Sequence, residues 1–97
     1  MILEVITPDE LLYKGNVSQV ILPGLDGSFG ILNSHAPLIS ALSKGNVRID
    51  QNVSENSDKK IYNGKLNKEF KTENQFSFEI KGGVVEVIDN KILVLAE

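Results

Sequence analysis

Apolar and polar residues alternate over short stretches of this chain, which is typical of β-strands. Phe76–Ile80 alternates in this way at every position, so one face of that stretch should be buried and the other solvated. No stretch of about 11 residues repeats apolar positions at the spacing of three and four that an amphipathic helix needs. Turn-forming residues recur about every eight to twelve positions. The pattern therefore predicts an all-β fold, either a sandwich or a barrel.

The β-rich runs define the expected strands. In chain order these are Leu3–Thr7, ended by Pro8, then Leu11–Gly15, Val17–Leu22, closed by Pro23-Gly24, then Ser28–Leu32, Leu38–Leu42, Val47–Ile49, Phe76–Ile80, Val84–Ile88 and Lys91–Leu95. Asp26-Gly27 predicts a tight turn, which makes residues 20–32 a hairpin, because glycine takes a positive φ without a steric clash. Asp89-Asn90 predicts a second, two-residue hairpin, since both residues tolerate left-handed backbone angles.

Residues 51–75 differ from the rest of the chain. They are rich in Asn, Ser and Lys, and they hold five of the ten basic residues of the chain (Lys59, Lys60, Lys65, Lys68 and Lys71). A polar excursion is expected here, with short strands around Lys60–Tyr62 and Lys68–Lys71 or a mobile loop in their place. No linker or internal repeat is visible, so residues 1–97 are expected to form a single domain.

Composition narrows the possible functions. Ten Lys and Arg against thirteen Asp and Glu disfavour nucleic-acid binding, which needs a basic face. The absence of cysteine excludes disulfides and Cys-ligated metals, and a single histidine leaves little room for an imidazole metal site. No metal or cofactor is expected. No apolar run approaches the roughly 20 residues of a membrane helix, and the N-terminus lacks the cationic start of a signal peptide, so a cytosolic or stromal location is expected.

Few residues suggest chemistry. Gly24, Gly27 and Gly30 resemble a phosphate loop, but the Gly-Lys-Ser/Thr element is missing and a strand follows them, so turns and a bulge are the favoured interpretation. His35 has Ser28, Ser34 and Ser40 nearby in the sequence, yet none lies in a nucleophile elbow, which favours a structural or interface role.

Single charged residues are the remaining candidates for a functional site. Glu4, Glu79 and Glu86 occupy positions that face solvent in alternating strands, where ordinary surface charge is the default. Arg48 is the sole arginine, and its planar group suits an interface carboxylate, although an exposed strand cation is the favoured interpretation. Composition and periodicity alone thus indicate a small all-β binding or assembly module.

A longer motif carries a more specific resemblance. The run Pro23–Leu42, with the sequence PGLDGSFGILNSHAPLISAL, closely resembles the signature of the epsilon subunit of F-type ATP synthases, called delta in mitochondria. Leu3–Pro8, residues 45–49 and the Gly-Gly stretch Phe78–Val87 agree with it, as does Leu93–Glu97. The resemblance extends over most of the chain, although residues 51–75 are longer than the corresponding family turn.

The resemblance implies a β-sandwich of about ten short, mostly antiparallel strands. It implies a rotor subunit of the central stalk, which links the gamma subunit to the polar loops of the membrane c-ring and couples ion-driven rotation to ATP synthesis. Such a subunit has no active site and no cofactor. It is peripheral, associates with the membrane only through the complex, and lies on the cytoplasmic face of the bacterial inner membrane, or on the stromal thylakoid face in a plastid.

The family usually continues past the position of Glu97 into a two-helix domain that is associated with ATP binding and with inhibition of ATP hydrolysis. The resemblance therefore implies coupling without inhibition by such helices for residues 1–97. A permanent interface with gamma would also leave apolar residues exposed on one outer sheet face of the isolated domain.

The resemblance also implies contact residues. The c-ring contact of the family falls on the loop that matches Asp26, Gly27 and Ser28. Many members carry an acid at the position of Ser28, so Asp26 is expected to supply the electrostatic part here. The gamma contact is expected at His35, Leu38, Ser40 and Arg48.

Two other functions compete with this one. A small β-sandwich module that binds carbohydrate or another ligand would expose aromatic side chains, but the chain has four Phe, two Tyr and no Trp. A hydrolase would use His35 as its base and would need a cleft around it. Neither alternative explains the run Pro23–Leu42.

Overall fold

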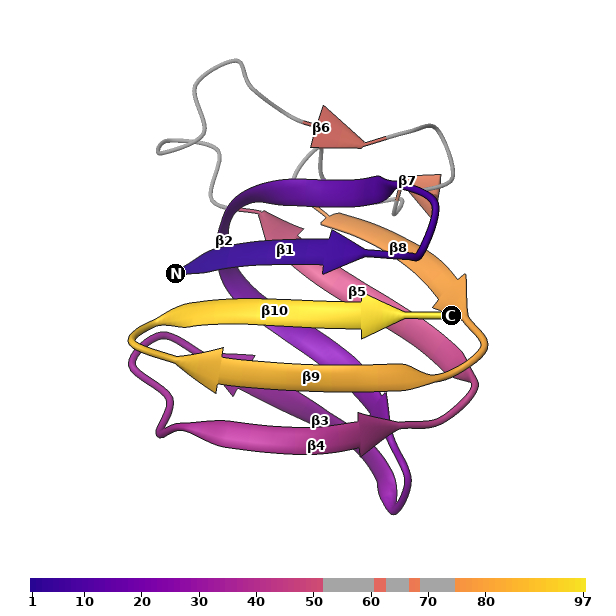
Figure 1. The fold of residues 1–97 in the computed structure, drawn as a ribbon. Coiled ribbons are helices and arrows are strands. Elements are labelled where there is room, and N and C mark those ends of the chain that lie inside the picture. The colour runs from indigo at the N-terminus through magenta and orange to yellow at the C-terminus, as the bar shows by residue number, and fades with distance from the viewer. Residues whose placement is uncertain (52–60, 63–66, 69–74) are drawn as a thin grey trace.

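The computed structural model describes residues 1–51, 61–62, 67–68 and 75–97, and these residues contain strands and no helix. The ten described strands are β1 (Ile2–Ile6), β2 (Leu11–Gly24), β3 (Gly27–Leu32), β4 (Leu38–Leu42), β5 (Gly45–Gln51), β6 (Ile61–Tyr62), β7 (Asn67–Lys68), β8 (Gln75–Ile80), β9 (Gly83–Ile88) and β10 (Lys91–Ala96) (Figure 1). The prediction of an all-β fold is confirmed.

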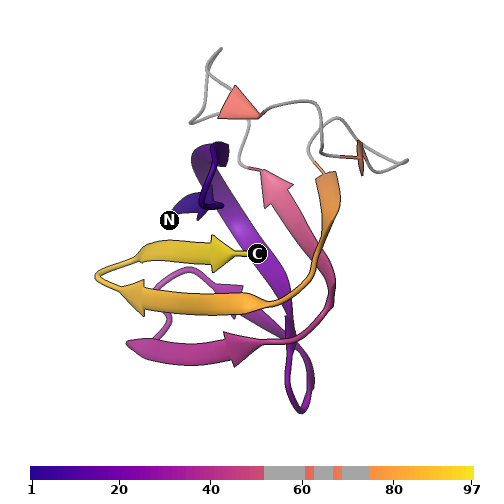
Figure 2. The same cartoon turned by 45° about the vertical axis from the view of Figure 1, so that its right-hand side comes forward.

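The strands form two layers that face each other (Figures 1 and 2). One layer has the order β1-β10-β9-β4, and the other joins β3, β2, β5 and β8. Of the described pairings, β1 with β10 is parallel and the rest are antiparallel. Figure 2 shows the strands of the two layers running at an angle to one another, as packed twisted sheets do. The predicted sandwich of mostly antiparallel strands is confirmed.

Strand β2 connects the two layers. Its first half pairs with β1 from Leu11 to Asn16, and its second half pairs with β5 and β3. A register shift between Val17 and Gln19 lies near the crossing, where a bulge bends the strand and turns it toward the second layer. At the far end of β2, Gly24 pairs with Leu42 of β4. Both ends of β2 therefore pair with strands of the first layer.

The prediction of two strands, 11–15 and 17–22, was therefore wrong. Gly15 and Asn16 indicated a break, but they pair with Leu3 and Ile2 of β1, and the strand continues. Pro23 indicated the end of a strand, but it pairs with Ser28, and its carbonyl oxygen accepts hydrogen bonds from Ser43 N (2.8 Å) and Ser43 Oγ (3.3 Å). Pairing across the sheet outweighs these local break signals.

Both predicted hairpins are present. In the first, Gly24 pairs with Gly27, so the turn residues are Leu25-Asp26, one position earlier than the expected Asp26-Gly27. Gly27 has a φ of 121°, which a residue with a side chain rarely adopts. In the second, Asp89 (φ 49°) and Asn90 (φ 62°) form the expected two-residue turn between β9 and β10.

The core lies between the two layers and is built from alternate residues of their strands. The buried apolar residues are Leu3, Val5, Leu12, Tyr13, Val17, Val20, Leu22, Ile31, Leu42, Val47, Ile49, Phe78, Ile80, Val85, Val87, Ile92, Val94 and Ala96. Successive side chains of a strand point to opposite faces, so the residues between the buried ones point outward. This fixes which side chains of β4, β9 and β10 a partner can reach.

The expected polar excursion at 51–75 falls mostly outside the described residues. Strand β6 at Ile61–Tyr62 agrees with the strand expected around Lys60–Tyr62, and β7 overlaps the one expected around Lys68–Lys71 at Lys68 alone. The remainder of both expectations lies outside the described residues. Within the described part of the chain, no helix is long and apolar enough to cross a membrane.

Candidate functional site

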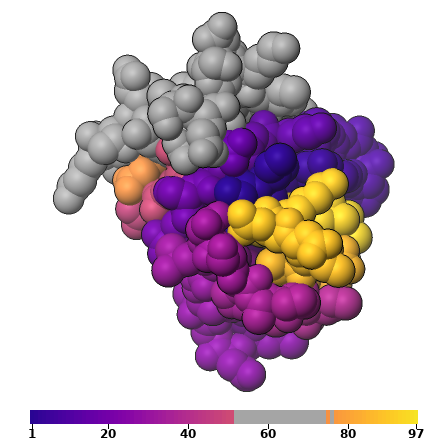
Figure 3. Space-filling model, turned by 90° about the vertical axis from the view of Figure 1, so that its left-hand side faces the viewer, coloured from indigo at the N-terminus to yellow at the C-terminus, as the bar shows by residue number. Residues whose placement is uncertain are grey.

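The tip of the β2–β3 hairpin is a projecting, exposed corner of the molecule. Asp26, Gly27 and Ser28, the residues expected at the c-ring, are all exposed there, and the hairpin forms the lower end of the molecule in Figures 1 and 3. Leu25 precedes them with 68% of its surface exposed. The sequence analysis did not single out Leu25. Its position was the available signal, because a residue in the turn after Gly24 has no partner across the hairpin to bury it. The tip thus offers one carboxylate beside one apolar side chain.

A shallow hollow beside the tip joins it to β4. It measures about 370 Å³ and is lined by residues 24–29 together with Ser40 and Ala41. The structure therefore brings Ser40, expected at gamma, next to the segment expected at the c-ring.

The β3–β4 loop carries His35 on a well-anchored stretch of backbone. Asn90 anchors the loop through two hydrogen bonds, because its Oδ1 accepts from Ser34 N (2.8 Å) and its Nδ2 donates to Asn33 Oδ1 (2.8 Å). His35 is exposed, and its Nδ1 lies 2.7 Å from the carbonyl oxygen of Ala36. An exposed imidazole in a fixed loop suits contact with another molecule.

The described residues do not assemble a catalytic or metal centre around His35. In this part of the chain no hydrogen bond joins His35 to Ser28, Ser34 or Ser40, which leaves the imidazole without the nucleophile that acyl transfer requires. The described stretches also hold no group of three His, Cys, Asp or Glu residues placed to bind a metal ion.

The four residues expected at gamma do not share one face. Leu38 and Ser40 are half-buried on the inner side of β4, and Leu38 packs against the core. Arg48 is exposed on β5, in the other layer, where its Nε lies 3.9 Å from Asp50 Oδ1. His35 lies in the loop before β4. A single flat contact cannot include all four side chains.

The outward side of the β1-β10-β9-β4 layer, here called the outer face, is unusually apolar. Its exposed large apolar residues are Ile2, Ile39, Val84, Ile88 and Leu95, and Ile39 is 73% exposed. Cross-strand pairing places them in neighbouring rows, since Ile39 pairs with Glu86 and Val84 pairs with Leu95. The prediction that one outer sheet face exposes apolar residues is confirmed. Groups of exposed apolar side chains on one face are typical of interaction sites.

Comparison with known proteins identifies the family. Residues 1–66 match the family described as "ATP synthase, Delta/Epsilon chain, beta-sandwich domain". The chain is 40% identical to the ATP synthase epsilon chain of Chlorobium limicola over 95 residues, which cover 98% of this chain and 86% of the relative. It is 37% identical to the epsilon chain of Syntrophomonas wolfei, of which it spans 56%. The chain therefore belongs to the delta/epsilon family of ATP synthase chains, in its β-sandwich domain, as the motif Pro23–Leu42 predicted.

Solved structures share the fold. A chain in the central stalk and c-ring part of the mitochondrial ATP synthase of Tetrahymena thermophila superposes with a TM-score of 0.66 at 20% identity, and 99% of this chain covers 62% of that one. A chain of the mitochondrial ATP synthase of Euglena gracilis gives a TM-score of 0.69 at 19% identity, with coverage of 99% and 49%. At these identities the likeness establishes the β-sandwich alone.

Proposed function

We propose that this chain is a central-stalk rotor subunit of an F-type ATP synthase, which links the gamma subunit to the c-ring and couples ion-driven rotation to ATP synthesis. Its contribution is mechanical, and bond making and breaking occur on other subunits. In this role it lies at the cytoplasmic face of the membrane, or its stromal equivalent, and is held there through the complex. The proposal concerns the β-sandwich domain and assigns no role to any other domain of the family.

The observation that supports the proposal is the presence of two separate exposed surfaces on one packed body of this family. The hairpin tip offers Leu25 and Asp26 at one end, while the outer face offers apolar surface on a different side. A close-packed interior transmits strain instead of absorbing it. Two partners held at these two surfaces would consequently turn together.

The residues inferred from the motif keep their proposed partners, but Leu38 and Ser40 change from contact to support. Asp26, Gly27 and Ser28 contact the polar loops of the c-ring, and Asp26 supplies the charge. His35 and Arg48 are the exposed residues proposed to contact gamma, Arg48 from the other layer of the sandwich. Leu38 and Ser40 act from within, because they hold β4 in the position from which neighbouring residues reach that partner.

Charge reversal at the tip tests the c-ring contact. Asp26→Lys should weaken binding of the chain to purified c-ring about fivefold at low salt, since one exposed ion pair contributes about 1 kcal/mol. The difference should shrink as salt screens the pair. Asp9→Lys is the matched control, because Asp9 is an exposed acid in the β1–β2 loop, away from the tip. Equal binding of Asp26→Lys and the unmodified chain at low salt would contradict the assignment.

A further inference from the structure

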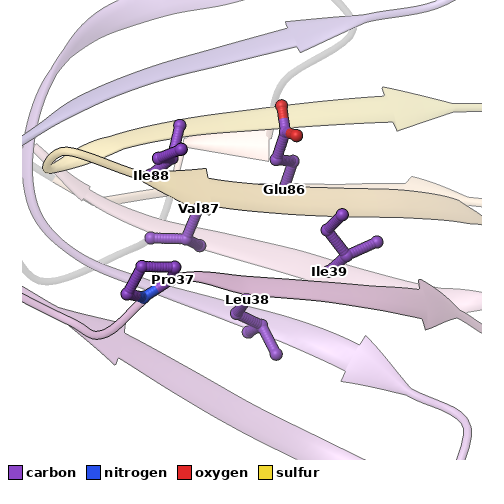
Figure 4. Close-up of a pocket in the computed structure, with 6 residues that line it drawn as sticks. All are labelled: Pro37, Leu38, Ile39, Glu86, Val87 and Ile88. Carbon is purple, nitrogen blue, oxygen red and sulfur yellow. The ribbon is translucent and has the colours of Figure 1, made fainter.

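Glu86 is an exposed carboxylate in the middle of the outer face. It pairs across the sheet with Ile39 of β4 on one side and with Leu93 of β10 on the other. Along its own strand the next outward residues are Val84 and Ile88, both exposed. Apolar side chains therefore surround Glu86 on all four sides of the sheet surface, as Figure 4 shows for Ile39 and Ile88.

The other acid of this face differs from Glu86 in having cations beside it. Glu4 Oε1 lies 3.6 Å from Lys91 Nζ and 4.0 Å from Lys14 Nζ. No ion pair or hydrogen bond of the Glu86 carboxylate occurs among the residues that the structure describes. The Glu86 side chain is exposed to solvent.

Two shallow hollows of the outer face meet at Ile39 and Glu86. Ile39 and Glu86 together line two shallow hollows, one with Pro37, Val87 and Ile88 and the other with Val84, Leu93 and Leu95. The two side chains are therefore shared by both hollows, and Figure 4 shows them at the first one. A surface that packs into both hollows must cover the Glu86 carboxylate.

Covering that carboxylate determines the chemistry of the partner. An ionised carboxylate that loses water and gains no partner is strongly disfavoured, so an apolar surface alone cannot dock here. A single Lys or Arg opposite Glu86 would replace the lost water. A second copy of this chain fits poorly, because a symmetric contact centred on Glu86 would bring two carboxylates together.

We infer that the outer face docks an apolar patch of the gamma subunit that carries one Lys or Arg opposite Glu86, and that Glu86 is the residue that selects this partner. The inference rests on the proposed function, which supplies gamma as the partner. It places the centre of the gamma contact at Ile39, Glu86 and their neighbours on β9 and β10.

The test measures the Kd of the chain for the gamma subunit within an α3β3γ assembly from the same ATP synthase. Glu86→Lys should weaken binding at least about 30-fold, and Glu86→Gln about tenfold, because both leave the partner cation without its carboxylate. Ile39→Asn should weaken it similarly through lost apolar contact. Glu79→Lys and Glu79→Gln are the controls, since Glu79 is an exposed acid on β8 in the other layer.

All of these positions are exposed, so the variants should keep the thermal unfolding midpoint of the unmodified chain. A gamma variant with the facing Lys or Arg changed to Glu should restore binding of Glu86→Lys. If the Glu86 variants bind gamma as the unmodified chain does, the inference is overturned while the proposed function stands. If the unmodified chain fails to bind the assembly, the proposed function itself fails. Dimerisation of the free chain that Glu86→Lys abolishes would also overturn the inference.

Discussion

At the scale of single residues, the fold depends on one glycine where two backbones approach closely. Gly83 begins β9 with a φ of 153°, and a Cβ atom built there would clash with the carbonyl oxygen of Leu95 on β10. This carbonyl belongs to the backbone of β10, so it cannot move aside without disturbing the pairing of Gly83 with Ala96. The Gly-Gly pair of the family motif thus has a physical reason in this chain.

We expect Gly83→Ala to lower the free energy of unfolding by about 2–3 kcal/mol, because the side chain forces a strained φ and a backbone shift together. Gly30→Ala is the matched control. Gly30 has an ordinary φ, and the nearest atom to its added Cβ would be Gln19 Nε2 at 3.3 Å, the end of a flexible side chain. Denaturant unfolding of both variants measures the effect. Equal stability of the two would refute this account of Gly83.

At the scale of elements, the β9–β10 turn anchors the loop that carries His35. Asn90 uses its positive φ to form the turn and its side chain to hold Asn33 and Ser34. The two tasks can be separated, because glycine at position 90 keeps the turn geometry but has no amide group. The loop before β4 therefore owes its position to a residue that is distant in sequence.

Asn90→Gly should accelerate hydrogen exchange of the Ser34 amide about five- to tenfold, since a net hydrogen bond contributes about 1 kcal/mol. Exchange of the core amides should be unchanged. Asp89→Gly relaxes the same turn and retains the Asn90 side chain, so the Ser34 amide should stay protected in that variant. Amide exchange followed by NMR gives both rates, and an unaltered Ser34 rate in Asn90→Gly would contradict the anchoring role.

The sequence predicted elements well where local chemistry decides them. Asp89-Asn90 gave the correct turn, because both residues tolerate the left-handed angles that this hairpin requires. It failed at β2, where Gly15 and Pro23 favour a break locally but cross-strand pairing with β1 and β3 holds the strand together. A strand that serves two layers depends on contacts between distant residues, which a single sequence does not display.

At the scale of the whole molecule, the positions of the two surfaces follow from the topology. The exposed acid Asp26 was predictable because a hairpin tip is always on the surface. The presence of an apolar outer face was predictable, but the residues that form it were not. Ile39, Val84 and Leu95 resemble core residues in sequence, and only the pairing of β4, β9 and β10 shows that they share the outward side.

The central claim is that this chain transmits rotation between gamma and the c-ring. The most direct test uses vesicles that contain the ATP synthase from the same organism, depleted of this chain, and follows the ATP-driven membrane potential with a voltage-sensitive dye, whichever ion is carried. Adding back the unmodified chain should restore the potential at a given rate of ATP hydrolysis, while Asp26→Lys and Glu86→Lys should restore less. A full potential in the depleted vesicles, before any chain is added, would contradict the claim.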